Sequence, residues 1–172
     1  EARASVTRVP HRWQRVYYTR LVNAITEDAS TRTESWLVIP GLSVASVPKG
    51  YLGEPLFGRQ LYAELRGSST GLGAKTDYLQ LLASGERVFD IAPAWHLLLR
   101  AEFGTTWADD FEGVPGSERF FAGGDRSVRG FGFNELSPVD ANGEKTGGKH
   151  LAVGTVEVIR DLPRNLGIAV FV

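Results

Sequence analysis

WHLLLRAEFGTTW, residues 95–107, alternates apolar and polar side chains along most of its length, which is the pattern of a β-strand with two different faces. One face carries Trp95, Leu97, Leu99, Ala101, Phe103 and Trp107, and the other carries His96, Arg100, Glu102 and Thr106. Charges in the middle of a strand are costly against a dry core, but they are tolerated where they face a polar lumen. The stretch therefore favours a transmembrane β-barrel over a β-sandwich.

The length of this strand also matches a membrane. Trp95 and Trp107 are twelve positions apart, which corresponds to about 40 Å of extended chain. A strand tilted by about 40° then covers roughly 30 Å along the membrane normal, close to the apolar band and aromatic girdles of outer-membrane barrels. Strands of globular sheets are shorter, at about 5–6 residues.

Six further segments have weaker strand patterns, and we expect strands at residues 11–28, 35–47, 57–68, 76–90, 149–160 and 166–172. The turns at 91–94 and 161–165 are short and the connection at 109–147 is long, as on the two sides of an outer-membrane barrel. The connection at 48–55, rich in Gly and Pro, is longer than this pattern predicts. Pro40 lacks an amide donor, so we expect a bulge or break in its strand.

The fold class predicted from these patterns is all-β, an antiparallel transmembrane β-barrel segment of about seven strands. We expect an open, curved sheet whose first and last strands do not pair with each other. Alternation within each strand also predicts the faces of individual side chains. The expected lipid-facing residues are Trp36, Leu61, Leu65, Leu97, Leu99, Phe103, Val156 and Ile168. The expected lumen-facing residues are Tyr62, Glu64, Arg66, Gln80, Arg100 and Glu102.

The composition of the 172 residues agrees with one domain and excludes several other classes of protein. The net charge is -1 and the pI is about 6.4, which does not point to nucleic acid as a partner. The chain has no cysteine, so disulfides and thiolate metal sites are impossible. The mean hydropathy is -0.13, as for barrel strands that turn half of their residues away from lipid.

The long connection at 109–147 has no sustained period of either kind, which is unusual for a loop of this length and typical of a functional one. A solvated linker would avoid its five phenylalanines, Phe111, Phe120, Phe121, Phe131 and Phe133. Gly123, Gly124 and Gly130 supply the backbone freedom for tight turns. We therefore expect this loop to fold into a compact tip that docks on another part of the protein.

The tip sequence RFFAGGDRSVRGF, residues 119–131, resembles the conserved lumen loop of the outer-membrane assembly-factor superfamily, the BamA/TamA type or bacterial surface antigen family. The wider string from Asp110-Phe111-Glu112 to Ser137-Pro138 is most similar to the TamA branch. The motif residues of this VRGF loop are Gly123, Gly124, Asp125, Val128, Arg129, Gly130 and Phe131. The resemblance implies a barrel of about sixteen strands, preceded by POTRA domains, of which residues 1–172 would form a part.

The resemblance also implies a partner for Arg129 on the barrel wall. In this superfamily the loop folds back into the lumen, and its arginine meets acids on the two following strands. Glu157 matches the first acid in the pattern Gly154-x-x-Glu157, and Phe171-Val172 matches the start of a Phe-x-Asp-x-Gly pattern that contains the second. An acid such as Glu157, in a segment that is otherwise apolar on both faces, would avoid lipid and so need a cation in the lumen. We therefore expect Arg129 to pair with Glu157.

The function implied by the resemblance is assembly or translocation of outer-membrane proteins, without catalysis or cofactors. The implied location is the bacterial outer membrane, and the implied partners are outer-membrane lipid, client outer-membrane proteins and an inner-membrane subunit. One alternative is a two-partner secretion transporter, which has a similar loop and exports a polypeptide. A weaker alternative is a soluble β-domain that binds a partner.

No pattern in the sequence favours an enzyme or a metal site. His11, His96 and His150 lack metal-ligand spacing. Asp109, Asp110 and Glu112 lack the defined spacing of oxygen ligands and the Gly turn of a calcium loop. The Gly123-Gly124-Asp125 turn is not a phosphate loop, because no helix follows it.

Overall fold

The computed structural model describes residues 2–9, 13–28, 31–46, 60–125 and 127–172, and within these ranges the side chains of 24–35 and 165 are left out of the description. The connection expected at 48–55 lies outside the described residues. The strands are β1 (Ala2–Arg8), β2 (Trp13–Asp28), β3 (Thr31–Ser46), β4 (Gln60–Ser68), β5 (Tyr78–Ala92), β6 (Trp95–Ala108), β7 (His150–Leu162) and β8 (Leu166–Phe171). Short 3₁₀ turns lie at η1 (Thr70–Leu72), η2 (Gly116–Glu118) and η3 (Pro163–Asn165).

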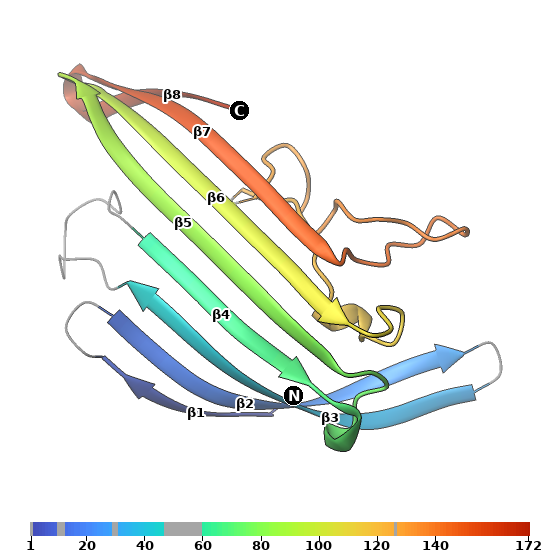
Figure 1. Cartoon of the computed structure of the whole chain (residues 1–172). Helices are drawn as coiled ribbons and strands as arrows, with labels where there is room; N and C mark the ends of the chain where they lie inside the picture. The colour runs from blue at the N-terminus through green and yellow to red at the C-terminus, as the bar shows by residue number, and fades with distance from the viewer. Residues whose placement is uncertain (1, 10–12, 29–30, 47–59, 126) are drawn as a thin grey trace.

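Each strand pairs antiparallel with the next, so one curved sheet runs from β1 to β8 in chain order (Figure 1). The sheet is open, because no ladder joins β1 to β8 among the described residues. The expected all-β class and open edges are confirmed. β5 and β6 have 15 and 14 residues, well above the length of ordinary globular strands.

The sheet has eight strands in the described residues, one more than the sequence predicts. The additional strand is β1, which pairs with β2 from Ala2↔Leu21 to Arg8↔Arg15. All seven residues of β1 are exposed, and its apolar side chains are few and small. Backbone pairing with a long neighbour, rather than burial, therefore forms this strand, and such pairing leaves little trace in the sequence.

Pro40 does not break its strand, which corrects the prediction of a bulge or interruption. The β2–β3 register continues through Thr19↔Pro40 without a shift. The effect appears on the other side of β3, where the ladder to β4 covers only Gly41–Ala45. Beyond it, the Ser68 hydroxyl donates to the Val38 carbonyl at 2.7 Å. The missing amide therefore limits the ladder with β4 and leaves the ladder with β2 intact.

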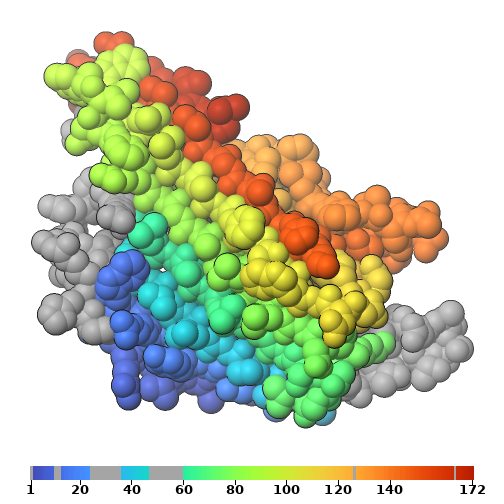
Figure 2. All heavy atoms as spheres, in the orientation of Figure 1, coloured from blue at the N-terminus to red at the C-terminus, as the bar shows by residue number. Residues whose placement is uncertain are grey.

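The two faces of the sheet differ in chemistry, as alternation predicts. We call the face that carries Gln80, Arg100 and Glu157 the inner face, and the opposite one the outer face. Cross-strand partners share a face, and the register pairs Leu99 with Val156 on the outer face and Arg100 with Glu86 on the inner face. In Figure 2 the strands form a continuous surface, and part of the long loop projects beyond β7. Exposed outer-face residues include Trp36, Leu65, Leu99, Phe103, Val156 and Ile168.

The four tryptophans of the chain all lie on the outer face and are all exposed. Trp13 and Trp95 are at the end of the sheet where β5 turns into β6. Trp36 and Trp107 are near the opposite end, where the long loop leaves β6. Two groups of tryptophan separated by apolar strand surface are the arrangement of the aromatic girdles of an outer-membrane barrel.

A small apolar cluster lies on the inner face, where alternation alone predicts polar residues. Leu37 and Ile39 of β3 are 1% and 0% exposed, and they pack with Ala74, Tyr78 and Val114. Val114 belongs to the long loop, which therefore covers this part of the inner face. The cluster is the point at which the loop adds a hydrophobic core to a sheet that otherwise has a polar inner face.

Candidate functional site

The long loop, residues 109–149, returns across the inner face of the sheet and lies behind β6 and β7 in Figure 1. Its backbone is tied by isolated bridges between Phe120 and Gly148 and between Ala122 and Leu136. Phe120 is buried against Gly104 of β6, because a Cβ at position 104 would lie 2.8 Å from the phenyl ring. The expected docked loop is therefore present, and a glycine in the wall makes room for its phenylalanine.

Arg129 meets the wall of the sheet close to the end of the described chain. Its Nη2 lies 2.9 Å from Oε2 of Glu157, and its guanidinium carbon lies 4.3 Å from the centre of the Phe171 ring. Glu157 and Phe171 are cross-strand partners on β7 and β8. The Arg129 Nε also donates to the Asp125 carbonyl at 3.2 Å. The predicted contact between Arg129 and Glu157 is therefore present.

The contact between Arg129 and Glu157 is governed by charge rather than by hydrogen-bond alignment. The side chain of Glu157 is 10% exposed and that of Arg129 is 27% exposed. Among the described residues, Oε2 of Glu157 has no donor with hydrogen-bond geometry, although the guanidinium nitrogen is within ion-pair distance. The carboxylate is thus neutralised by proximity, and Phe171 supplies a second surface for the cation.

The glycines of the tip adopt the backbone that the turn requires. Gly123 and Gly124 have φ values of +114° and +103°, where side chains are strained. A Cβ at Gly123 would lie 2.4 Å from the Gly132 carbonyl oxygen, so this turn is closed to any other residue. The Gly124 amide donates to the Phe131 carbonyl at 3.1 Å. The tip is therefore a tight, backbone-bonded turn that presents Arg129 to the wall.

Other residues of the motif are placed differently. Asp125 is exposed, and it is its backbone carbonyl that accepts the hydrogen bond from Arg129. Phe131 is 47% exposed and Val128 is half-buried. Gly154 does not take part: it lies on the outer face, and a Cβ there would meet nothing within 4 Å. The structure therefore brings together Arg129, Glu157 and Phe171, and separates Gly154 from them.

Arg119 organises the loop, and the sequence analysis does not identify it. Its guanidinium donates to the carbonyls of Val114, Thr146 and Glu112 at 3.0, 3.1 and 2.9 Å. The ring of Phe111 lies 4.8 Å from the guanidinium carbon. Because backbone oxygens exist at every position, their use by an arginine has no signature in the sequence.

Glu118 likewise has no signature in the sequence, and it is 2% exposed beneath the loop. Its Oε2 lies 2.6 Å from Nη2 of Arg20 on β2 and 3.5 Å from Nη2 of Arg66 on β4. Its carbonyl accepts a hydrogen bond from the Gln80 amide at 2.7 Å. Arg20 and Glu118 are 98 positions apart, so only the fold brings them together.

The rest of the inner face is a network of paired polar groups. Glu64 accepts hydrogen bonds from Tyr18 and, at 2.7 Å, from Tyr62. Arg100 pairs with Glu86 at 2.7 Å. At one end of the sheet, His96 lies 2.6 Å from Asp90 and 3.0 Å from Asp161, which links β5, β6 and β7. No three His, Asp or Glu side chains among the described residues are grouped as they would be around a metal ion.

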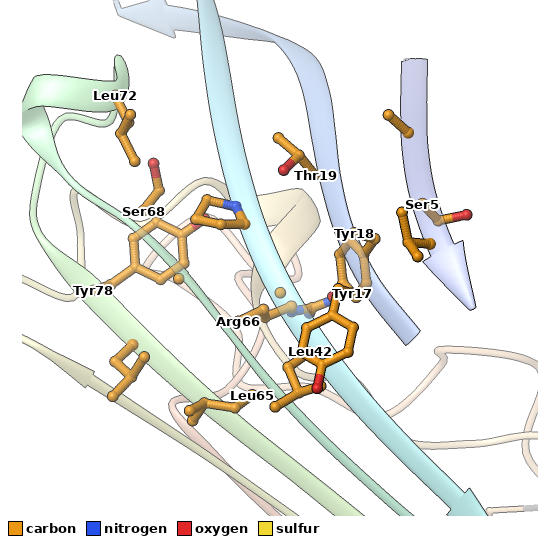
Figure 3. Close-up of a pocket in the computed structure, with 16 residues that line it drawn as sticks. Ser5, Tyr17, Tyr18, Thr19, Leu42, Leu65, Arg66, Ser68, Leu72 and Tyr78 are labelled. Atoms are coloured by element: carbon orange, nitrogen blue, oxygen red, sulfur yellow. The ribbon is translucent and has the colours of Figure 1, made fainter. Parts of the chain in front are cut away.

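A hollow with a volume of about 760 Å³ lies where the β3–β4 ladder ends (Figure 3). Most of its lining comes from the outer face, including Tyr17, Leu42 and Leu65, and Leu72 of η1 adds to it. Arg66 reaches it from the inner side, where Gln80 and Glu118 engage its guanidinium. The hollow is therefore a mainly apolar depression on the outer side of the sheet.

Comparison with known proteins agrees with this arrangement. Residues 58–172, which include β4–β8 and the long loop, match the Omp85 superfamily domain. The outer membrane protein assembly factor BamA of Nitratidesulfovibrio vulgaris is 29% identical over 99 residues, 57% of this chain and 12% of the relative. The chain thus spans only a small part of the length of that relative. No helix among the described residues is long and apolar enough to cross a membrane.

Three findings agree with one another. They are the open antiparallel sheet with tryptophans exposed on its outer face, the docked loop that carries RFFAGGDRSVRGF, and the family match over residues 58–172. The chain belongs to the Omp85 superfamily, and it is β-barrel sequence of the bacterial outer membrane.

Proposed function

We propose that this chain is barrel sequence of a TamA-like factor that inserts or exports outer-membrane proteins without catalysis. The observation that carries the proposal is the docked loop, in which Arg129 lies between Glu157 and Phe171. In this proposal the loop braces the inner wall, so that one side of the barrel stays rigid while another side opens to a client protein. Clients would be recognised by backbone pairing with an exposed strand edge.

The chemistry of the inner face supports a mechanical role. Its charged groups meet one another: Arg129 with Glu157, Arg100 with Glu86, and Arg66 with Glu118. A catalytic site would need a nucleophile and a base within hydrogen-bond reach and open to a substrate. Ion pairs of this kind instead stabilise one arrangement of the inner face, because separating a pair leaves a buried charge without its partner, which costs free energy.

The outer face supports outer-membrane lipid as a partner. Leu65, Leu99 and Phe103 are exposed between the two groups of tryptophan. A contiguous exposed apolar surface of this kind marks contact with a membrane or another protein. We further propose client outer-membrane proteins and an inner-membrane subunit as protein partners of the whole molecule. The BamA relative, an outer membrane protein assembly factor, supports the client class only.

The test is the assembly of a client barrel by the full-length protein reconstituted in liposomes. Arg129→Ala should lower the rate of client assembly, since Glu157 would be left beneath the loop without its cation. Arg129→Lys should rescue the rate only in part, because an ammonium lacks the planar fork of a guanidinium. Wild-type rates for both variants, with both correctly folded, would contradict the proposal.

The two-partner secretion transporter remains the second candidate, because the similar loop of that class would dock in the same way. The two candidates differ in the fate of the client. A client that becomes protease-resistant within the liposome membrane indicates assembly, whereas a soluble client that appears in the liposome interior indicates export. Export of a soluble polypeptide together with no membrane insertion would favour the transporter.

A further inference from the structure

Glu118 of the long loop contacts side chains from three strands of the sheet, β2, β4 and β5. Its carboxylate receives a hydrogen bond from Arg20 of β2 at 2.6 Å and lies 3.5 Å from Nη2 of Arg66 of β4. Its carbonyl receives the side-chain amide of Gln80 of β5 at 2.7 Å. Three strands therefore hold one loop residue that is 2% exposed.

The surroundings of Glu118 show a built site rather than a chance contact. Gln80 is 1% exposed, and it also donates to the Thr106 hydroxyl at 2.9 Å and accepts from Arg66 Nε at 2.9 Å. Glu118 itself ends the η2 turn, with its amide bonded to the Pro115 carbonyl at 2.9 Å. The carboxylate thus has a fixed backbone on one side and a fixed wall on the other, which lowers the entropy lost on pairing.

Glu118 and Arg129 dock on different parts of the sheet. The partners of Glu118 are on β2, β4 and β5, and the partners of Arg129 are on β7 and β8. In the part of the sheet that the structure describes, β6 alone joins these two groups of strands. Between the two anchors the loop packs Phe120 against Gly104 of β6. The loop therefore crosses the inner face as a tie between two groups of strands.

We propose that Glu118 is a positioning residue that forms a second anchor of the loop, separate from the Arg129 anchor, and sets how β2–β5 lie relative to β7–β8. The proposal builds on the bracing role proposed above for the loop. It adds that the brace has two ends, and that loss of the Glu118 end releases the first half of the loop while Arg129 still contacts the wall. Release would begin at Val114, which packs on Leu37 and Ile39 next to Glu118.

The test uses a thiol as a reporter of loop release, which suits a chain without cysteine. Val114→Cys is introduced into the full-length protein, with any cysteine outside this chain replaced by serine. Cysteine is a small hydrophobe that fits a valine site. The reporter is 1% exposed in the docked loop, and Ser117→Cys, at an exposed position of the same turn, serves as the open reference. Maleimide labelling is measured in liposomes, and the mobility of the folded barrel on unheated gels shows that the variant is folded.

Glu118→Gln should speed labelling of the Val114→Cys reporter by about tenfold or more, because the two guanidiniums lose a carboxylate held under the loop. Glu118→Asp keeps the charge and should restore at least half of the protection. Glu112→Gln is the matched control: it removes a carboxylate from the same loop that is 82% exposed and pairs with Arg119 at 3.4 Å. This control should leave labelling within about twofold of wild type, as for other exposed pairs.

Unchanged labelling in a folded Glu118→Gln variant would overturn the proposal, and so would equal effects of Glu118→Gln and Glu112→Gln. Should Glu118→Gln not fold, Arg66→Gln gives the same test from the wall side, with the same faster labelling expected. The labelling experiment does not depend on client assembly. If Glu118→Gln speeds labelling while Arg129→Ala assembles clients at the wild-type rate, the Glu118 anchor is supported and the proposed function is contradicted. If Glu118→Gln leaves labelling unchanged while Arg129→Ala slows assembly, the proposed function is supported and the Glu118 anchor is contradicted.

Discussion

Arg119 and Arg129 use the same side chain in two different ways. Arg119 donates to four backbone carbonyls within its own loop and is 9% exposed, so its role is internal to the loop. Arg129 contacts the carboxylate of Glu157 and the ring of Phe171 on the wall. The first residue folds the loop, and the second fastens it to the sheet.

Arg119→Ala should destabilise the docked loop by about 3 kcal/mol, because several carbonyls lose charged donors at once. Arg119→Lys should recover little of this, since one ammonium cannot reach carbonyls in three directions as the guanidinium fork does. The measurement is the rate of limited proteolysis between residues 109 and 149 in the folded barrel. A wild-type cleavage rate in Arg119→Ala would show that these hydrogen bonds do not hold the loop.

Gly123→Ala and Gly130→Ala form a matched pair at two positive φ angles. At Gly123 the added Cβ would lie 2.4 Å from a backbone oxygen, whereas at Gly130 it would meet nothing within 4 Å. Backbone strain alone costs about 1–3 kcal/mol at either position. Gly123→Ala should therefore impair docking of the Arg129 tip clearly more than Gly130→Ala, as read by the rate of limited proteolysis between residues 109 and 149 in the folded barrel. Equal effects would mean that strain, not space, decides the turn.

At the scale of elements, β6 shows how one strand serves two environments. Ala101 faces outward midway between Trp95 and Trp107, and Glu102 faces inward at the next position. On the outer face a charge would enter the apolar band, and on the inner face it would enter the polar network. Adjacent residues of one strand therefore allow the membrane interpretation to be tested directly.

Ala101→Arg should lower the unfolding free energy by about 2–4 kcal/mol, and Glu102→Arg should change it by less than about 1 kcal/mol, since lipid-facing charges at mid-depth are costly and lumen-facing ones are not. The measurement is a urea titration of the full-length protein folded into lipid vesicles. If Glu102→Arg lowered the unfolding free energy more than Ala101→Arg, the assignment of the outer face to lipid and of the inner face to the lumen would be contradicted.

The sequence predicts the strands well where alternation is strong and poorly where pairing alone forms them. β6 was expected at 95–107 and is found at Trp95–Ala108. β1 alternates apolar and polar residues, but its apolar side chains, Ala2, Ala4 and Val6, are few and small, so only its ladder with β2 identifies it. Leu37 and Ile39 are buried on the inner face because the loop covers them, and no pattern within β3 reveals a cover supplied by residue 114.

The site was predictable only in part, and for a similar reason. The contact between Arg129 and Glu157 was expected from the resemblance to a known loop, and the structure contains it. Spacing alone could not have predicted it. Glu118 was not identified, because its partners Arg20 and Arg66 lie on strands far away in the chain. Contacts between side chains that are distant in sequence can be predicted only when the register of the sheet is known.

At the scale of the whole molecule, the loop joins parts of the sheet that the strand order keeps apart. Glu118 docks on β2, β4 and β5, Phe120 on β6, and Arg129 on β7 and β8. An open or opening sheet gains rigidity from such a crosswise tie, because bending the sheet must break buried charge pairs. The central claim is that the Arg129 end of this tie is needed for client assembly.

A double-mutant cycle on client assembly tests that claim most directly. The rates are measured for the full-length wild type, Arg129→Ala, Glu157→Gln and the double variant in the same liposomes. If the two residues act as one contact, the double variant should be no slower than Arg129→Ala, with a coupling of about 1–3 kcal/mol between residues in contact. Additive losses, or assembly at the wild-type rate in all variants, would contradict the account.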